Sequence, residues 1–326
     1  MRRKALVLSI VGAGALVLAG AALAGNGGTL PPAPHSPNAD SVRQAYWFVL
    51  AFAAIVFVGV EGALVALIIR YRRGKRARYA DGVQIHGSTR LEIIWTVVPV
   101  LILTAIAFFI FIKLPSIADA PKASAADSTT ITVEGHQFYW LFRYPNGAIS
   151  VGTMTAPADN VVNEGVHAPD TDVLHSWWVP ALGGKIDAIP GRTNHTWFKA
   201  AAGVYPARCS DLCGIQHTLM TATVSVVPRS QYESFIKERA ANPDSIALGK
   251  EEWDHVCAVC HKLNETYVGP SLGSNPIVTS AKDLTGILRN GVGRMPAVGS
   301  NWTDDQIAAL VKYTKTIVKP PSANGS

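Results

Sequence analysis

Two long apolar stretches constrain the fold of this chain more than any other feature of its sequence. Residues 46–69 contain a single charged residue, Glu61, and residues 93–112 contain none. As a helix, either stretch is long enough to cross a bilayer core of about 30 Å. The basic run at 70–78 directly follows the first stretch, and basic residues favour the cytoplasmic side. The pattern predicts a membrane hairpin with spans at 46–69 and 93–112 and a cytoplasmic loop at 70–92.

The N-terminal residues have the composition of a secretory signal. A basic start at residues 2–4 is followed by small apolar residues up to Ala24, which predicts a cleaved signal peptide at 1–24. The alternative is an uncleaved first helix. Both interpretations leave residues 25–45, a Gly/Pro-rich arm, outside the cytoplasm. They also place everything after the second span on that same side.

The soluble part of the chain divides by composition. Residues 113–128 are rich in Ala, Ser, Asp and Pro and are expected to form a linker. Residues 129–228 alternate β-branched and aromatic stretches with turn signals, which predicts an all-β sandwich or barrel. A polar, helix-prone connector follows at 229–242.

The last part of the chain, residues 243–320, is expected to be helical. Thr303 and Gln306 have the spacing of a capping box, which predicts a final helix running to about Val318. The composition of residues 321–326 predicts a disordered tail.

A short segment between residues 209 and 220 collects soft metal ligands. It contains Cys209, Cys213, His217 and Met220, and thiolate, imidazole and thioether groups together favour copper. A disulfide between the two cysteines is the alternative that an extracytoplasmic location allows. That alternative requires neither the histidine nor the methionine.

A second cysteine pair carries a different motif. Cys257, Cys260 and His261 form Cys-x-x-Cys-His, the attachment motif of c-type haem, in which the histidine is an axial ligand. Met295 is the only methionine further along the chain and is the expected second axial ligand. A redox dithiol or half of a zinc site are alternatives, but neither accounts for the adjacent histidine.

A copper centre generally needs another imidazole, and upstream the candidate is His175. This residue lies in an apolar, aromatic segment, where a histidine is more often a hydrogen-bonded structural residue. From the residues alone, both interpretations stay open.

Several segments together resemble subunit II of the haem-copper cytochrome c oxidases. The resemblance covers roughly residues 40–228, and the fused haem motif makes the chain similar to the caa3 type. Residues 269–272 also resemble the loop that backs the proximal histidine in class I cytochromes c. The matching segments are 91–96, 135–140, 172–180, 185–192 and 209–220.

The resemblance implies a multi-domain protein with a two-helix transmembrane hairpin, an all-β cupredoxin domain and an all-α class I cytochrome c domain. It also implies a binuclear copper A centre. Asp211 departs from the family, which usually has a glutamate that helps to bind magnesium, so the magnesium role of this side chain is in doubt. The implied copper ligands are His175 and His217, the bridging Cys209 and Cys213, and the weak axial Met220 and carbonyl of Asp211.

The resemblance assigns further roles along the electron and proton paths. Phe138 stands where the family usually has the tryptophan through which electrons enter, so Phe138, Tyr139 and Trp140 are path candidates. The alternative for these three is an aromatic core strand. Glu92 corresponds to the mouth of a proton path into subunit I, although a carboxylate at a helix start is also favoured by the helix dipole.

The implied function is electron entry into a terminal oxidase of the plasma membrane. Electrons would pass from cytochrome c, or from a membrane quinol–cytochrome c reductase, through haem c and copper A to subunit I. Oxygen reduction and proton pumping would occur in that partner, and subunit III is a further expected partner. A copper A nitric oxide reductase and a membrane-tethered electron shuttle without a catalytic partner are the alternatives.

Charge excludes one class of partner. The chain carries 29 basic and 23 acidic residues, a net charge of +6, and much of that excess lies in the run at 70–78. Downstream of this run, no basic patch is interleaved with aromatic residues, so we expect no nucleic-acid partner.

Overall fold

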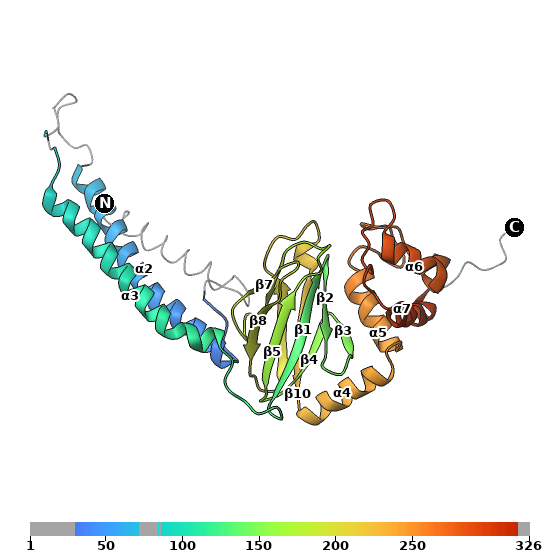
Figure 1. Ribbon diagram of the computed structural model, residues 1–326. Helices are drawn as coiled ribbons and strands as arrows, with labels where there is room; N and C mark the ends of the chain where they lie inside the picture. Colours follow the sequence, from blue (N-terminus) through green and yellow to red (C-terminus); the bar gives the residue numbers. More distant parts are fainter. Residues whose placement is uncertain (1–29, 72–83, 85, 319–326) are drawn as a thin grey trace, which may run out of the picture. The chain divides into compact units, whose positions relative to one another are not determined.

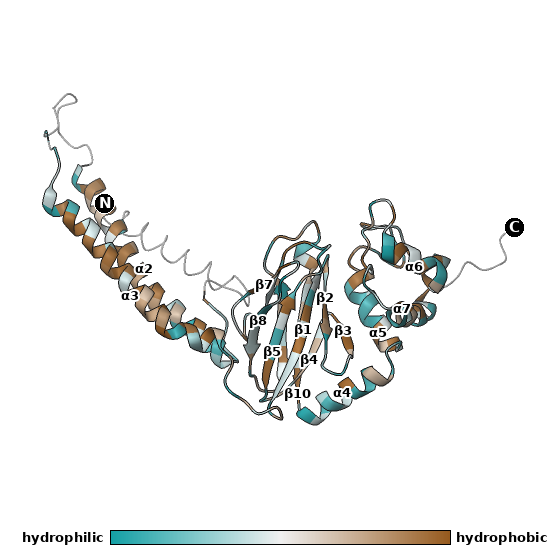
Figure 2. Cartoon of the chain, viewed as in Figure 1, coloured by the Kyte–Doolittle hydropathy of each residue, from teal (hydrophilic) through white to brown (hydrophobic). Residues whose placement is uncertain are grey.

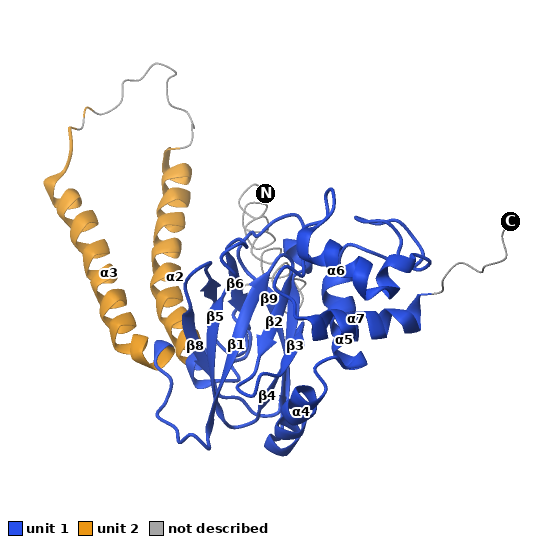
Figure 3. Cartoon of the chain, turned by 45° about the vertical axis from the view of Figure 1, so that its right-hand side comes forward, with its two compact units in different colours: residues 1–40, 118–326 blue, residues 41–117 orange. Residues whose placement is uncertain are grey.

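The structure is a computed structural model that describes residues 30–71, 84 and 86–318. The predicted signal peptide at 1–24, most of the basic run at 70–78 and the predicted tail at 321–326 lie outside the described residues. The chain divides into two compact units, shown in Figure 3. One is Ser41–Ile117, and the other contains the remaining residues.

The first unit consists of two long apolar helices, α2 (Pro37–Tyr71) and α3 (Thr89–Ala118). The expected spans lie within them, and the helices extend beyond those spans at both ends. Both have the length and composition of membrane spans, and apolar residues cover most of their length in Figure 2. Lys113 donates to Gln44 at 2.5 Å and Phe48 stacks on Phe109 at 4.0 Å, so the two helices pack together. Their exposed apolar side chains require a hydrocarbon environment.

The N-terminal arm is anchored to the β domain. We expected an extended arm at 25–45, but α2 already begins at Pro37, a residue suited to the first turn of a helix. Asn38 is 1% exposed and donates to the carbonyl of Trp197 at 2.5 Å. Ser36 accepts from the backbone of Lys199 at 3.1 Å.

The β domain is a sandwich of two five-stranded sheets (Figure 1). The strand order is β3-β2-β1-β5-β8 in one sheet and β4-β10-β9-β6-β7 in the other. The strands are β1 (Ser128–His136), β2 (Tyr139–Arg143), β3 (Ile149–Val151), β4 (Thr153–Pro157), β5 (Val161–His167), β6 (His175–Trp178), β7 (Ile186–Ala188), β8 (Asn194–Phe198), β9 (Gly203–Cys209) and β10 (Thr221–Val227).

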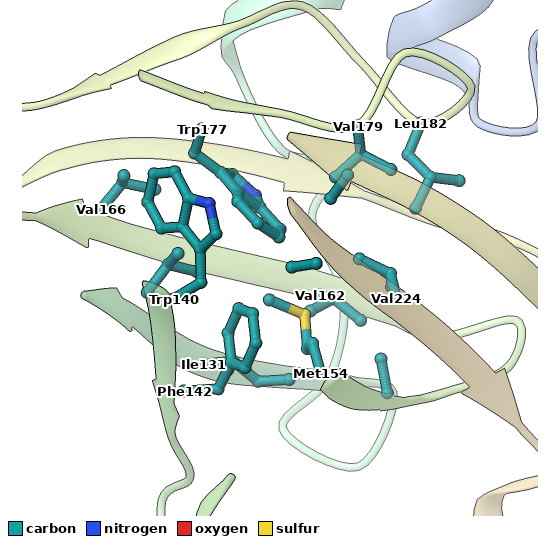
Figure 4. Close-up of a cluster of buried hydrophobic side chains, with 14 of the residues drawn as sticks. Ile131, Trp140, Phe142, Met154, Val162, Val166, Trp177, Val179, Leu182 and Val224 are labelled. Atoms are coloured by element: carbon teal, nitrogen blue, oxygen red, sulfur yellow. The ribbon is translucent and has the colours of Figure 1, made fainter. Parts of the chain in front are cut away.

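Large side chains from both sheets fill the space between them. Trp140 and Phe142 of β2 meet Trp177 of β6 with ring centroids 4.9 and 5.5 Å apart, and Met154 lies in the same cluster (Figure 4). Trp140 and Phe142 are two residues apart, so they point to the same face of their strand. Cys209, Cys213 and Met220 belong to this cluster, so the candidate site is built on the edge of the core.

The C-terminal domain is helical, as expected. It is preceded by α4 (Arg229–Ala241), the predicted connector, whose Tyr232 packs in the core of the β domain. The domain itself contains α5 (Ile246–Glu252), a π-helical turn (Trp253–Cys257), η4 (Pro276–Thr279), α6 (Ala281–Asn290) and α7 (Asp304–Ile317). The capping box of Thr303 and Gln306 is confirmed. At Gly249, a Cβ would lie 2.0 Å from the carbonyl oxygen of Ala309, so glycine lets α5 and α7 approach closely.

Candidate metal centre

The cluster of soft ligands lies in the loop that joins β9 to β10. Cys209 is the last residue of β9 and Met220 immediately precedes β10. The backbone N–H of Cys209 donates to the carbonyl of Met220 at 2.9 Å, which closes the loop at its base. Because β9 and β10 are antiparallel neighbours, the loop brings both of its ends back to one edge of the sheet.

His175 reaches this loop from the neighbouring strand. It is the first residue of β6, and β6 pairs with β9 so that Trp177 lies opposite Cys209. Its side chain is fully buried. At Gly135 of β1, a Cβ would lie 3.1 Å from the His175 side chain, so the absence of a side chain there leaves room for the imidazole.

The donor atoms converge. The ligand atoms of His175, Cys209 and Cys213 all lie within 4.8 Å of one another. The Nδ1 atom of His175 is 4.0 Å from the Cys209 sulfur, and Nδ1 of His217 is 3.6 Å from the Cys213 sulfur. The thioether of Met220 is 3.7 Å from the Cys213 sulfur. The structure therefore brings together all four ligands of the loop with the upstream histidine.

The two sulfurs suit a shared metal and not a disulfide. Cys209 and Cys213 are free thiols with their Sγ atoms 3.9 Å apart, whereas a disulfide bond is about 2.05 Å long. Both sulfurs could reach the same ion, since metal–sulfur bonds measure about 2.3 Å. Burial of both side chains and the soft donor set fit copper.

A carboxylate orients the buried imidazole. The Nε2 atom of His175 lies 3.0 Å from Oδ1 of Asp172, which leaves Nδ1 directed at the sulfur. Burial would lower the pKa of His175, but the hydrogen bond to Asp172 and the contact with Cys209 outweigh it and raise that pKa. Burial would raise the pKa of Asp172. The hydrogen bonds from His175 and from the backbone N–H of Val173 outweigh burial, so the pKa of Asp172 is lowered.

The backbone and the side chain of Asp211 have separate contacts. Its carbonyl oxygen is 3.3 Å from the Cys209 sulfur, on the metal side of the loop. Its carboxylate Oδ1 accepts from the N–H of Leu212 at 2.9 Å, which stabilises the turn. Only the carbonyl of Asp211 therefore faces the cluster of donors.

The three aromatic path candidates lie in different surroundings. Trp140 is buried in the sandwich core, with its ring 6.1 Å from the ring of His175. Phe138 packs against the metal loop, since a Cβ at Gly214 would lie 2.9 Å from its ring. Tyr139 is 1% exposed but lies on the opposite face of β2 from Trp140.

The haem-attachment motif is arranged for an axial histidine. Nδ1 of His261 is 2.8 Å from the carbonyl oxygen of Pro270, so Nε2 is the ring nitrogen left for iron. At Gly269, a Cβ would lie 2.3 Å from the His261 ring, so this loop fits closely behind the imidazole. Burial raises the pKa of Cys257 to about 12 and also raises that of Cys260. Met295 packs against the core of the same domain, and the residues present fit a covalently attached haem.

Glu92 lies apart from these centres. It is in the first turn of α3, where its N–H donates to the carbonyl of Ser88 at 3.0 Å and its side chain is exposed. At this position the helix dipole of α3 stabilises a negatively charged carboxylate. The other carboxylate of the apolar segments, Glu61, is exposed on α2.

Two residues near the copper ligands were not identified from the sequence. Asp172 lay within a segment that we recognised, and its spacing of three residues from His175 was the available signal. His136 also lay within a matching segment, at 135–140, but its contact with Asp172 depends on the tertiary structure. Its ring stacks on Tyr139 at 4.6 Å, and Nδ1 is 4.0 Å from a carboxylate oxygen of Asp172.

Three family models match the chain in succession. The model of the cytochrome c oxidase subunit II transmembrane domain matches residues 27–112. The model of the cytochrome c oxidase subunit II periplasmic domain matches residues 152–227. The model described as cytochrome c oxidase, cbb3-type, subunit III matches residues 244–313, which contain the haem-attachment motif.

Individual relatives agree with these models. Cytochrome c oxidase subunit 2 of Alkalihalophilus pseudofirmus is 34% identical over 243 residues, which is 72% of this chain and 70% of the relative. The same subunit of Bacillus sp. strain PS3 is 30% identical over 285 residues, covering 76% and 80% of the two chains. A solved structure, the periplasmic domain of the oxidase subunit II of Bradyrhizobium japonicum, is 34% identical over 37% of this chain and 97% of its own, with a TM-score of 0.34.

Proposed function

Because this chain belongs to the cytochrome c oxidase subunit II family and carries a cytochrome c domain, we propose that it is the electron-entry subunit of a terminal respiratory oxidase. Electrons would pass through haem c and a binuclear copper A centre to the oxygen-reducing subunit I. The observation that carries this proposal is the convergence of His175, Cys209 and Cys213 on one buried point.

We assign the copper ligands by their positions around the two sulfurs. Cys209 and Cys213 would hold both copper ions, and His175 and His217 would each contribute Nδ1. Met220 and the carbonyl of Asp211 would be weaker ligands. When bound, the copper pair supplies a one-electron redox centre. The chain's own contribution is to fix the donors on a rigid sheet edge, to orient His175 through Asp172 and to exclude water by burial.

We assign the haem to Cys257 and Cys260, with His261 and Met295 as axial ligands. When bound, the haem supplies a second one-electron centre. The hydrogen bond between His261 and the Pro270 carbonyl would hold the imidazole in place, and the close fit of Gly269 would support its ring.

The partners and location follow from the family. The protein is anchored in the membrane by two apolar helices, and its folded domains lie outside the bilayer. We propose that this membrane is the plasma membrane and that the domains are extracytoplasmic. The partners would be subunits I and III, the membrane lipid, and cytochrome c or a quinol–cytochrome c reductase as the donor.

Two further roles would involve the interface with subunit I: proton uptake and magnesium binding. We propose that Glu92 lies at the mouth of a proton path into that subunit, where oxygen reduction drives proton pumping. For magnesium, the carboxylate of Asp211 is engaged by the N–H of Leu212. We therefore favour copper binding by the Asp211 carbonyl over magnesium binding by its side chain.

Metal analysis of the purified complex, with optical and EPR spectra, tests this function. We expect two coppers and one haem c per copy of this chain, with the EPR signal of a mixed-valence copper pair. A single copper per chain, or none, would refute the assignment. Consumption of nitric oxide in place of oxygen by the same preparation would indicate a nitric oxide reductase.

A further inference from the structure

One strand of the sandwich is buried on both faces. Trp140 and Phe142 of β2 point into the sandwich core, so Tyr139 and Leu141 point outward. β2 pairs with β1 and β3 in antiparallel fashion, and the outer face of antiparallel strands in a sandwich commonly meets water. Nevertheless Tyr139 and Leu141 are each 1% exposed, and Val151 of the neighbouring β3 is fully buried.

The C-terminal helical domain covers this face. Tyr139, Leu141 and Val151 belong to the same hydrophobic cluster as Leu310 and Trp302 of that domain. The hydroxyl of Tyr139 accepts from Nε1 of Trp302 at 3.0 Å and donates to the carbonyl of Val298 at 2.9 Å. Buried polar groups in folded proteins nearly always have a hydrogen-bond partner. Tyr139 and Trp302 provide this partner for each other across the contact between the two domains.

A second set of contacts lies at β3. The N–H of Val151 donates to Glu251 at 3.0 Å, and the other carboxylate oxygen of Glu251 is 2.5 Å from the guanidinium of Arg239. Gly152 has a positive φ of 72°, and a Cβ there would lie 2.1 Å from the ring of His255. The glycine that follows β3 therefore leaves the space that His255 of the helical domain occupies.

From Tyr139, a row of contacts leads to the copper ligands. Its ring stacks on His136 at 4.6 Å with an angle of 1° between the planes. His136 lies 4.0 Å from Asp172, and Asp172 is 3.0 Å from Nε2 of His175. Trp302, Tyr139, His136, Asp172 and His175 thus connect the haem-attachment domain to the copper donors.

We propose that the outer face of β2 and β3 is a docking surface for the chain's own cytochrome domain, and that Tyr139 and Trp302 position that domain and begin the electron route to the copper centre. This inference rests on the proposed function. An external donor would then reduce the docked cytochrome domain and not the copper domain.

The route conducts by tunnelling and not by side-chain oxidation. With both cofactors bound, one electron would leave the haem held by Cys257 and Cys260, and the same electron would reach the copper pair. The hydroxyl of Tyr139 donates to a backbone carbonyl, which is no base for its proton, and burial raises its pKa. Tyr139 therefore stays neutral and unoxidised, and no proton moves.

Three variants of the full chain in its complex separate docking from conduction. Tyr139→Phe removes the hydroxyl that joins the two domains. His136→Leu removes the ring stacked on Tyr139 and interrupts the route, but it leaves both hydrogen bonds of the Tyr139 hydroxyl in place. Tyr144→Phe is the matched control, because its buried hydroxyl bonds to Ser150 within the copper domain. Two quantities are measured. The first is amide hydrogen exchange of residues 298–303, which Tyr144 does not contact, and the second is the rate of internal electron transfer after rapid photoreduction of the haem.

In Tyr139→Phe we expect amide exchange at the contact to accelerate ~10-fold, from the loss of two buried hydrogen bonds. Internal transfer should also slow relative to Tyr144→Phe, with the copper EPR signal unchanged. In His136→Leu, transfer should slow severalfold while exchange stays as in the wild type. Should Tyr139→Phe not assemble, Trp302→Phe removes the same bond from the other side.

If internal electron transfer in both Tyr139→Phe and His136→Leu is as fast as in Tyr144→Phe, the proposed route is wrong. Unchanged exchange in Tyr139→Phe would overturn the docking surface. A wild-type chain without copper or haem refutes the proposed function instead. The exchange comparison in the purified complex reports on the contact between Tyr139 and Trp302 and not on the electron route, so it decides the docking separately.

Discussion

Glu164 allows a quantitative test of the copper domain's energetics. This carboxylate lies on β5 and is 4% exposed, and Oε1 accepts from Nε1 of Trp177 at 3.1 Å. Burial raises its pKa to about 7, against a smaller opposite effect of the Trp177 bond. Replacement by glutamine keeps the shape and the acceptor for Trp177 but removes the ionisable group.

The magnitude follows from the difference between the folded and unfolded pKa. Below the ordinary value of 4.5 the carboxyl is protonated in both states and has no effect on the pH dependence. Between 4.5 and about 7 the unfolded chain loses the proton while the folded chain keeps it, so stability falls with pH. At 1.36 kcal/mol per pH unit, the total loss above pH 7 is about 3 kcal/mol.

Glu164→Gln should abolish this loss. At pH 8 we expect the variant to unfold roughly 6–12 °C above the wild type. About 1 kcal/mol shifts Tm by about 2–4 °C in a unit of about 150–250 residues, which is the size of the β and helical domains together. At pH 4.5 the gain should vanish. Thermal unfolding of the full-length chain in detergent, followed by tryptophan fluorescence at both pH values, measures the difference. Glu238→Gln, at an exposed position of α4, is the control.

A Tm difference that is the same at both pH values would refute the reasoning, because it would indicate a packing effect and not a titration. A variant less stable than the wild type at pH 8 would refute it as well. In that case the new amide N–H₂, which needs an acceptor in the core, would outweigh the removal of the charge.

Three further predictions concern the two centres and the acid limit. Cys213→Ser should lower the copper content to one ion or none per chain and abolish the mixed-valence EPR signal, while haem content stays at one. Met295→Leu should keep the haem covalently attached, because the cysteines remain, but should lose the optical signature of methionine ligation and lower the haem potential. Burial opposes the low pKa of Glu134, but His136 and Arg143 bring it to about 2. Its contribution is therefore complete above about pH 4.5 and is lost as pH falls towards 2, so acid titration of Glu134→Gln should show a shallower loss of stability over that window.

Features that depend on neighbouring residues could be predicted from the sequence. Residues 46–69 and 93–112 are apolar enough to require a membrane wherever the chain places them. The haem-attachment motif is complete within residues 257–261. The loop at 209–220 carries four soft donors, because a single short loop brings them together. The capping box at Thr303 depends only on residue 306, three positions later.

Contacts between distant strands and domains could not be predicted in this way. The residues alone left His175 open between a structural and a ligand role, because its distance from Cys209 depends on the pairing of β6 with β9. The residues alone do not show that Glu164 points into the core, since a shift of one residue in register would have turned it to solvent.

By itself, the sequence determined the two apolar helices, the haem-attachment motif and the set of soft donors in the loop, since each rests on local composition or spacing. Only the tertiary structure decided which atoms those donors face, with Asp172 orienting His175 and the carbonyl of Asp211 facing Cys209. It also brought Tyr139 against Trp302, 163 residues away along the chain. The physical reason is that sheet order, register and domain docking depend on the packing of the whole core. No single segment contains enough information to specify them.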